Sequence, residues 1–114
     1  MKTIIYNNIQ FTLGQNAQDN WNILEQLTKI NNNYIWFHLN SFPSCYVIMH
    51  CSLEDLRDAS YNDFLIYGAQ LCKSNTKYKN FTNLKICYTS LKHIKKTQKI
   101  GEVIISGKRN IIKL

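Results

Sequence analysis

The chain has 114 residues, of which 45% are hydrophobic and 18% charged, a composition that excludes a disordered chain and fits one globular core but not two. Its formal net charge is +7, and residues 73–114 hold 11 of the 14 lysines and arginines but only one of the 7 acids. This clustering predicts a positive surface on which a polyanion such as RNA or DNA would gain from counterion release, the alternative being a basic, solvated surface without a partner.

The sequence shows no pattern typical of a membrane span or a secretion signal. No window reaches the roughly 18 apolar residues that a membrane span needs, and the apolar run near the N-terminus is too short for a signal peptide. The four cysteines lie in apolar stretches without a C-x-x-C pair, which indicates reduced, mostly buried thiols and neither a zinc site nor another cofactor. We expect a cytoplasmic protein, with the nucleus as the alternative.

The first third of the chain predicts a β-hairpin followed by a helix. Residues 2–6 and 9–13 are β-branched and aromatic runs, separated by two asparagines that tolerate a tight turn. Asn16, with Asp19 three residues later, has the spacing of a helix N-cap. Apolar residues then recur at three-residue intervals, which predicts a helix over 17–30 with one face on a sheet.

The middle of the chain predicts two buried strands and a second helix. Residues 34–40 and 45–51 are rich in β-formers and are joined by a short turn that holds the only proline. Residues 52–55 predict a short helical turn. Ser60 begins a capping-box pattern, with an acid in place of the usual Glu or Gln, and an apolar stripe extends the predicted helix to about Ser74.

The last third predicts strands connected by a basic loop. Residues 84–89 alternate between polar and apolar, 91–99 form the basic loop, and 103–105 and 111–114 are short strands separated by a glycine turn. The expected architecture is a single α+β domain over 1–114, with a mixed β-sheet and two principal helices packed on it.

Five stretches of this sequence, in this order and spacing, resemble the NFACT-R domain. That domain is the RNA-binding-type domain at the C-terminal side of the NFACT proteins of ribosome-associated quality control, and it also occurs in small stand-alone proteins. The resemblance implies a binding module that acts near ribosomes or tRNA-like RNA, without the activity of a full NFACT protein. The stretches are LGQNAQDN at 13–20, IWFHL at 35–39, FP at 42–43, YT at 88–89 with KHIKK at 92–96, and GEV at 101–103.

Three departures from the family pattern remove polar groups. The family has arginine at the position of Gln15, an acid at the position of Tyr34, and Gly-Ser-His where Ser44, Cys45 and Tyr46 stand. One cation, one carboxylate and one imidazole are therefore replaced together. A polar site that depended on them in the family would be altered here.

Basic residues of the C-terminal segment are the main candidates for contacts with nucleic acid. The ammonium groups of Lys92, Lys95 and Lys96 would share one face if the segment were helical, and in a loop they could converge on neighbouring phosphates. The alternative is a flexible, solvated loop. Four further cations could extend the surface: Lys85, Lys99, Lys108 and Arg109.

Three aromatic or imidazole side chains are weaker candidates. Tyr88, beside the basic loop, could stack on a base, although such a tyrosine is more often half-buried in the sheet. Trp36 and His38 alternate with apolar residues in one strand and should share a face of the sheet. If that face is open, the two side chains could contact bases, and if helices cover it, they belong to the core. The strand is apolar on both faces, which favours the core. A Cys–His pair of His38 with Cys45 lacks an activating third residue, so we expect no catalysis.

The sequence therefore predicts a non-catalytic RNA-binding module that holds nucleic-acid backbone through a C-terminal basic surface, with tRNA or ribosomal RNA as the expected partner. One alternative is a protein-interaction adaptor that docks on ribosomal or quality-control proteins through a sheet edge or the acidic region 54–63. Another is a DNA-binding module, because phosphate contacts do not distinguish DNA from RNA. The oligomeric state does not follow from the sequence.

Overall fold

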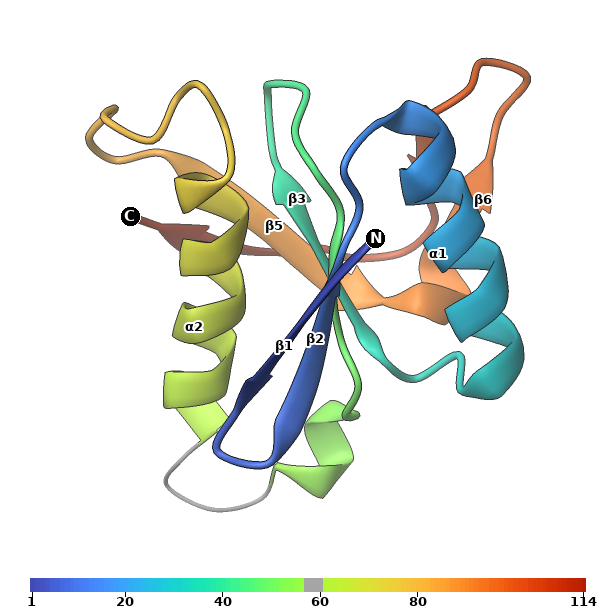
Figure 1. The fold of residues 1–114 in the computed structure, drawn as a ribbon, viewed down its shortest axis with the longest axis horizontal. Coiled ribbons are helices and arrows are strands. Elements are labelled where there is room, and N and C mark those ends of the chain that lie inside the picture. Colours follow the sequence, from blue (N-terminus) through green and yellow to red (C-terminus); the bar gives the residue numbers. More distant parts are fainter. Residues whose placement is uncertain (57–60) are drawn as a thin grey trace.

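A six-stranded antiparallel sheet lies between two helices in the computed structural model, which describes residues 1–56 and 61–114 (Figure 1). The strand order is β1-β2-β4-β3-β5-β8, and β6 and β7 form a separate two-stranded sheet. The elements are β1 (Lys2–Tyr6), β2 (Ile9–Leu13), α1 (Ala17–Ile30), β3 (Ile35–Leu39), β4 (Val47–Met49), η1 (Leu53–Asp55), α2 (Tyr61–Ser74), β5 (Lys85–Ser90), η2 (Leu91–His93), β6 (Ile94–Lys96), β7 (Val103–Ile105) and β8 (Asn110–Lys113).

The N-terminal hairpin and the first helix form where the sequence predicts them. Asn7 and Asn8 have φ angles of 47° and 69°, so both central turn residues adopt the left-handed conformation that a tight hairpin turn needs. The side chain of Asn16 accepts a hydrogen bond of 2.8 Å from the backbone N–H of Asp19 and caps α1. Local signals are sufficient for this third of the fold.

The alternation of β3 divides its side chains between two hydrophobic clusters, one on each face of the sheet. Ile35, Phe37 and Leu39 belong to the cluster on the α2 side. Trp36 belongs to the cluster on the α1 side, together with apolar residues of α1. The sheet is therefore covered by a helix on each face, and its ends remain for a binding site.

The α+β class with two principal helices is confirmed, but the sheet is antiparallel throughout and not mixed. The strands on either side of α1, β2 and β3, do run parallel to each other, but β4 lies between them and pairs antiparallel with both. In the same way β3 lies between β4 and β5, the strands that flank α2. Strand–helix–strand order predicts parallel strands, and the inserted strand makes every neighbouring pair antiparallel.

Two further expectations concern segments with weak patterns. The predicted basic loop over 91–99 contains η2 and the strand β6, which pairs with β7. The capping-box serine, Ser60, lies outside the described residues, as does part of the acidic region 54–63. Cys51, Cys72 and Cys87 are buried and Cys45 is half-buried. Neither of the two described helices is long and apolar enough to cross a membrane.

Candidate nucleic-acid interface

Four connections meet at one end of the sheet, the upper end in Figure 1. They are the turn into α1, the β3–β4 loop, the loop that follows α2, and the tip of the β6–β7 hairpin. Two hollows of about 580 and 520 Å³ lie among them, and both are lined by Asn20, Pro43 and Ser44. We call this pair of adjoining hollows the trough. Its walls come from segments that are distant in the sequence.

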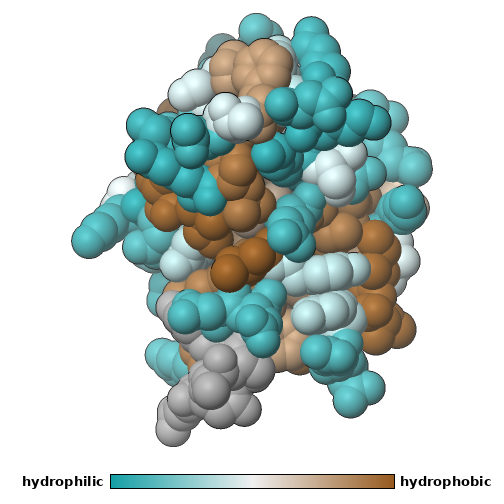
Figure 2. All heavy atoms as spheres, turned by 90° about the vertical axis from the view of Figure 1, so that its left-hand side faces the viewer, coloured by the Kyte–Doolittle hydropathy of each residue, from teal (hydrophilic) through white to brown (hydrophobic). Residues whose placement is uncertain are grey.

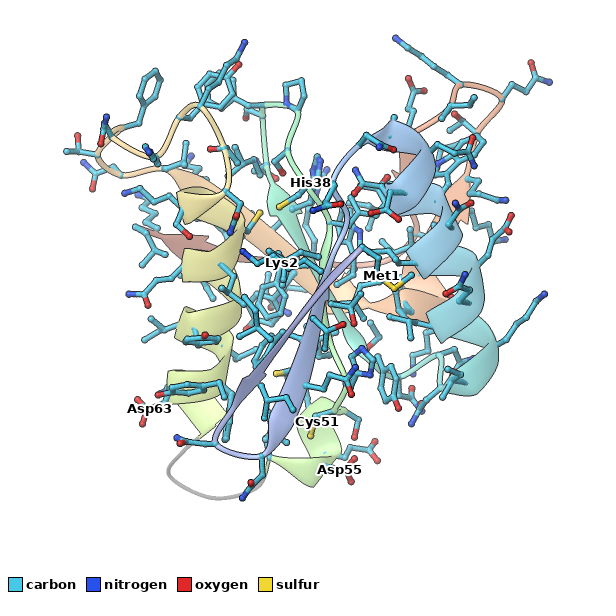
Figure 3. All side chains as sticks on the ribbon, viewed as in Figure 1. Met1, Lys2, His38, Cys51, Asp55 and Asp63 are labelled. Atoms are coloured by element: carbon cyan, nitrogen blue, oxygen red, sulfur yellow. The ribbon has the colours of Figure 1, made fainter. Side chains whose placement is uncertain are left out.

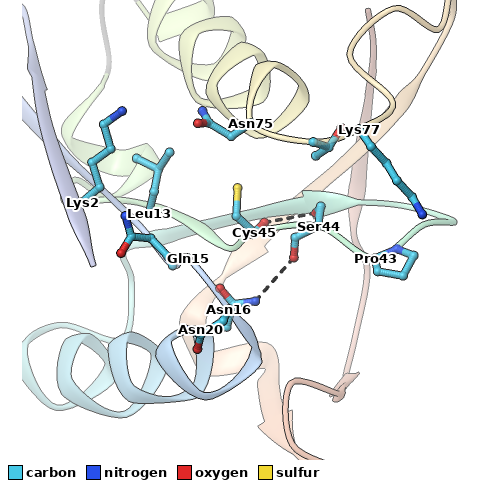
Figure 4. Close-up of a pocket in the computed structure, with 12 residues that line it drawn as sticks. Lys2, Leu13, Gln15, Asn16, Asn20, Pro43, Ser44, Cys45, Asn75 and Lys77 are labelled. Carbon is cyan, nitrogen blue, oxygen red and sulfur yellow. Dashed lines mark hydrogen bonds between the residues drawn. The ribbon is translucent and has the colours of Figure 1, made fainter.

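Cations line both hollows of the trough. Lys2 and Lys77 line the first hollow, which is drawn in Figure 4, and Lys99 and Arg109 line the second. Glu102 is the acidic residue among the lining of the second hollow. In Figure 3, Asp55 and Asp63 lie at the opposite end of the molecule from His38, which lines the second hollow. The lining of the trough therefore contains four basic side chains and one acidic side chain.

The hairpin tip that carries Lys99 is held in place by the core. The Tyr46 hydroxyl donates a hydrogen bond of 2.7 Å to the carbonyl of Gly101, and the indole N–H of Trp21 donates one of 3.3 Å to the carbonyl of Glu102. Gly101 has a φ of +85°, and a Cβ added there would lie 2.7 Å from the Cβ of Ala17, so the tip requires glycine. Burial raises the pKa of Tyr46, which keeps its hydroxyl protonated as a donor.

The guanidinium of Arg109 is also oriented by protein contacts. It donates a hydrogen bond of 3.4 Å to Oδ1 of Asn40 and lies near the thiol of Cys87. Burial raises the pKa of the Cys87 thiol, and the charge of Arg109 opposes that rise, so the thiol remains neutral. A guanidinium fixed at one edge leaves its remaining N–H donors for a phosphate.

Trp36 and His38 share a face, and that face is covered. Trp36 is 1% exposed, and its ring stacks on that of His38 at a centroid distance of 5.4 Å. Trp36 therefore lies in the core, as the apolar pattern of the strand favours, and the alternative of an open base-stacking platform is excluded because α1 covers the ring. Its indole N–H is buried, with no acceptor in residues 1–56 and 61–114. His38 is half-buried, and burial lowers its pKa, so it offers the second hollow a neutral imidazole and no charge.

The three lysines expected to act together are not on one face. Lys92 lies in η2, while Lys95 and Lys96 are successive residues of β6, whose side chains point in opposite directions. Lys96 forms an ion pair with Glu25, and its Nζ lies 5.0 Å from the ring centroid of Trp21. Lys96 is therefore occupied within the protein.

Lys92 and the trough lie at opposite ends of α1. The backbone N–H of Lys92 bonds to the carbonyl of Asn32, just beyond the last turn of α1, whereas the hairpin tip packs on Ala17 in the first turn. The 14 residues of α1 span about 21 Å at 1.5 Å per residue. Lys92 therefore cannot bind the same phosphate as Lys99.

The other predicted side chains lie around the β5–β8 edge of the sheet. Lys85 is paired with Lys113 across β5 and β8, and both are exposed. Lys108, also exposed, lies in the turn before β8. Tyr88 packs against the α2-side cluster, with its ring 5.8 Å from that of Phe37. Tyr88 therefore lies on the face of the sheet opposite Trp36 and His38, and it does not line the trough.

The cysteine and histidine of the rejected catalytic pair face opposite sides of the sheet. Cys45 packs against the α2-side cluster, whereas the ring of His38 contacts Trp36 and Tyr46 on the α1 side. A hydrogen bond with the Cys72 side chain lowers the pKa of the Cys45 thiol. Within the described part of the chain, no three His, Cys, Asp or Glu side chains gather in a way that could hold a metal ion.

The residues that depart from the family pattern fall mostly in the trough. Gln15, Ser44 and Cys45 line the first hollow (Figure 4), and Tyr46 lines the second. Tyr34 is elsewhere, with its ring 5.1 Å from that of His50. Sequence reasoning missed the two trough lysines that come from β1 and from the loop after α2, because both lie outside the basic loop 91–99 on which the prediction was centred.

Comparisons with known proteins give the fold and no family. No protein-family model matches the sequence, and no curated protein matches it either. A similar solved structure is that of the C-terminal part of the fibronectin/fibrinogen-binding protein from Streptococcus suis, with a TM-score of 0.75 and 17% sequence identity. The match covers 93% of this chain and 40% of that one. At this identity the likeness shows a shared fold alone.

Proposed function

We propose that this chain is a non-catalytic RNA-binding module whose trough holds the sugar-phosphate backbone. The observation that carries the proposal is the placing of four cations, Lys2, Lys77, Lys99 and Arg109, along adjoining hollows at one end of the molecule. Among the described residues, none of the four lies within ion-pair distance of a carboxylate. Phosphates can therefore replace water around these cations without breaking a salt bridge.

The class of RNA and the cellular setting come from the resemblance to the NFACT-R domain. That resemblance supports tRNA or ribosomal RNA as the ligand and the ribosome, in quality control of translation, as the place of action. The hydrogen bonds that hold the hairpin tip and orient Arg109 support a preformed binding surface. This module is expected to bind without altering its ligand chemically.

A titration of fluorescently labelled RNA at two salt concentrations tests the proposal. Each phosphate contact to a single strand contributes about −0.7 to the slope of log K against log salt. Four contacts therefore predict binding about 50-fold weaker at about 200 mM than at about 50 mM salt. Reversing two charges in Lys99→Glu/Arg109→Glu is expected to abolish most of the binding at the lower salt. Lys29→Glu reverses the charge of one exposed lysine at the far end of α1 and serves as a control for charge reversal outside the trough. Unchanged binding by the trough variant would exclude the trough as the site.

Protein binding is the second candidate function. The protein of known structure described above is named for its binding of fibronectin and fibrinogen, and β1 and β8 are the edge strands of the sheet here, each paired on one side only among the described residues. An exposed strand edge can pair with a strand of a partner. A partner retained on the immobilised protein after nuclease treatment would favour this adaptor. Binding of DNA and RNA with equal affinity would favour recognition of phosphate alone.

A further inference from the structure

Three aromatic rings form a cluster at the trough end of the molecule. Phe42 comes from the β3–β4 loop, and Tyr78 and Phe81 come from the loop after α2. The rings of Phe42 and Tyr78 stack at 4.3 Å, and the ring of Phe81 lies edge-on to that of Tyr78 at 5.4 Å. Phe42 and Tyr78 are 36 residues apart in sequence, and contacts between their two loops bring the three rings together. We call these three residues the aromatic cluster.

Two of the three rings in the aromatic cluster are exposed. Phe42 is 36% exposed and Phe81 is 51% exposed, whereas Tyr78 is half-buried and packs against the α2-side hydrophobic cluster. Seen from the α2 side, a small hydrophobic area at the upper end of the molecule is bordered by hydrophilic side chains (Figure 2). Contiguous exposed aromatic surface of this kind is typical of a binding site.

Cations flank the aromatic cluster on both sides. Lys77 lines the first hollow, and its Nζ lies 5.4 Å from the ring centroid of Tyr78. Phe42 itself lines the second hollow, together with Lys99 and Arg109. The rings therefore stand beside the positions where the proposed function places phosphates. Alternating cationic and aromatic groups are what proteins use to bind single strands, because every base has a face that can stack and every nucleotide has a charge.

We propose that the aromatic cluster is a stacking platform for unpaired bases, so that the ligand of the trough is single-stranded RNA. This inference rests on the proposed function. The bases of a duplex are stacked on each other and offer no free face to an aromatic side chain, whereas the bases of a loop or a single-stranded end do. Phe81 presents the most exposed ring of the cluster and carries the main stacking contact. The backbone of the same strand follows Lys77 on one side and Lys99 with Arg109 on the other.

Three labelled probes of equal length separate stacking from phosphate contacts: a single-stranded RNA of mixed sequence without internal pairing, the same strand annealed to its complement, and an abasic strand with the sugar-phosphate backbone alone. The single strand is expected to bind more tightly than the duplex. Loss of one stacked base corresponds to about tenfold weaker binding. Phe81→Ala should therefore bind the single strand about tenfold more weakly and the abasic strand with unchanged affinity.

Matched variants keep the result interpretable. Phe81→Tyr retains an aromatic face and should bind like the wild type, whereas Phe81→Leu retains apolar area without it and should behave like Phe81→Ala. Urea unfolding of each variant checks the fold. Equal binding of the single strand by Phe81→Ala and wild type, or preference for the duplex, would overturn the inference. If the stacking inference failed but Lys99→Glu/Arg109→Glu still lost RNA binding, the proposed function would stand without the stacking platform. If the wild type bound no RNA at low salt, the proposed function and the stacking inference would both fall.

Discussion

Replacing Asn20 by alanine is expected to destabilise the fold, because this buried amide joins α1 to the β3–β4 loop. Asn20 is 6% exposed; its Oδ1 accepts a hydrogen bond of 3.1 Å from the backbone N–H of Tyr46, and its Nδ2 donates one of 3.4 Å to the carbonyl of Ser44. A buried N–H left without an acceptor costs about 1–3 kcal/mol. The bond to Ser44 is long and only partly buried, so water can replace it. The expected loss is about 2 kcal/mol of unfolding free energy, or roughly 6–12 °C in melting temperature.

Gly14→Ala should act on the same contact from the other side. A Cβ at Gly14 would lie 1.9 Å from Oδ1 and 2.9 Å from Cγ of Asn20, so the amide would have to leave its position. Gly14 is not among the residues with a positive φ, which makes the effect one of space and not of backbone strain. The single variant is therefore expected to cost at least about 2 kcal/mol, since it breaks the same hydrogen bonds.

The double variant Gly14→Ala/Asn20→Ala makes the prediction specific. The truncated side chain at position 20 no longer has the Oδ1 and Cγ atoms that collide with the added methyl group, although Cα of residue 20 remains 3.0 Å away. The two losses should therefore not add, and we expect a coupling energy of about 1–2 kcal/mol in favour of the double variant. Urea unfolding measures all four proteins, and Asn22→Ala, an exposed asparagine of the same helix, is the control. Additivity within about 0.5 kcal/mol would refute this account of how α1 holds the trough.

Three further outcomes follow from the structure. Iodoacetamide at neutral pH should modify Cys45 before the three buried cysteines, because Cys45 lines a hollow and a hydrogen bond with a neighbouring thiol lowers its pKa. Equal modification rates for all four cysteines, measured by mass spectrometry, would contradict this. Burial lowers the pKa values of His38 and His50, so the unfolded chain binds protons more readily than the folded one below pH 6.5. Stability is then retained above that pH and lost as pH falls through the lower folded pKa values. The urea midpoint should therefore be lower at about pH 5.5 than at about pH 7.5. The drop should be smaller in the variant in which both histidines are changed to glutamine. Gly68→Ala should lower the unfolding free energy by about 1–3 kcal/mol in the same assay, since the added Cβ would lie 2.5 Å from a ring carbon of Phe37. A gain in stability, as the better helix propensity of alanine would give, would show instead that the ring can move.

Local sequence signals predicted the elements whose causes are local. The asparagine pair of the N-terminal turn, the cap at Asn16 and the period of α1 each act within a few residues, and the structure has each of them in place. The strand β6 was missed because Lys95 and Lys96 give it no apolar alternation, and its existence depends on pairing with β7. The antiparallel order of the sheet depends on which strand is inserted between which, and no periodicity encodes that.

The candidate site was predicted only in part for the same reason. The uneven charge of residues 73–114 indicated a basic surface, and Lys99 and Arg109 line the trough. The other two trough lysines come from β1 and from the loop after α2, and tertiary packing alone places them near the β3–β4 loop. Lys96 was predicted to contact nucleic acid but is paired with Glu25 instead, and that ion pair joins residues 71 positions apart, which the sequence pattern does not reveal.

The salt dependence of RNA binding tests the central claim most directly, namely that the trough cations contact phosphates. The slope of log K against log salt is measured for the wild type, for Lys99→Ala/Arg109→Ala and for the control Lys29→Ala. Four contacts predict a slope of about −2.8 for wild type and control, and the loss of two contacts predicts about −1.4 for the trough variant. Equal slopes for all three proteins would contradict the claim, because they would mean that the phosphates are held elsewhere.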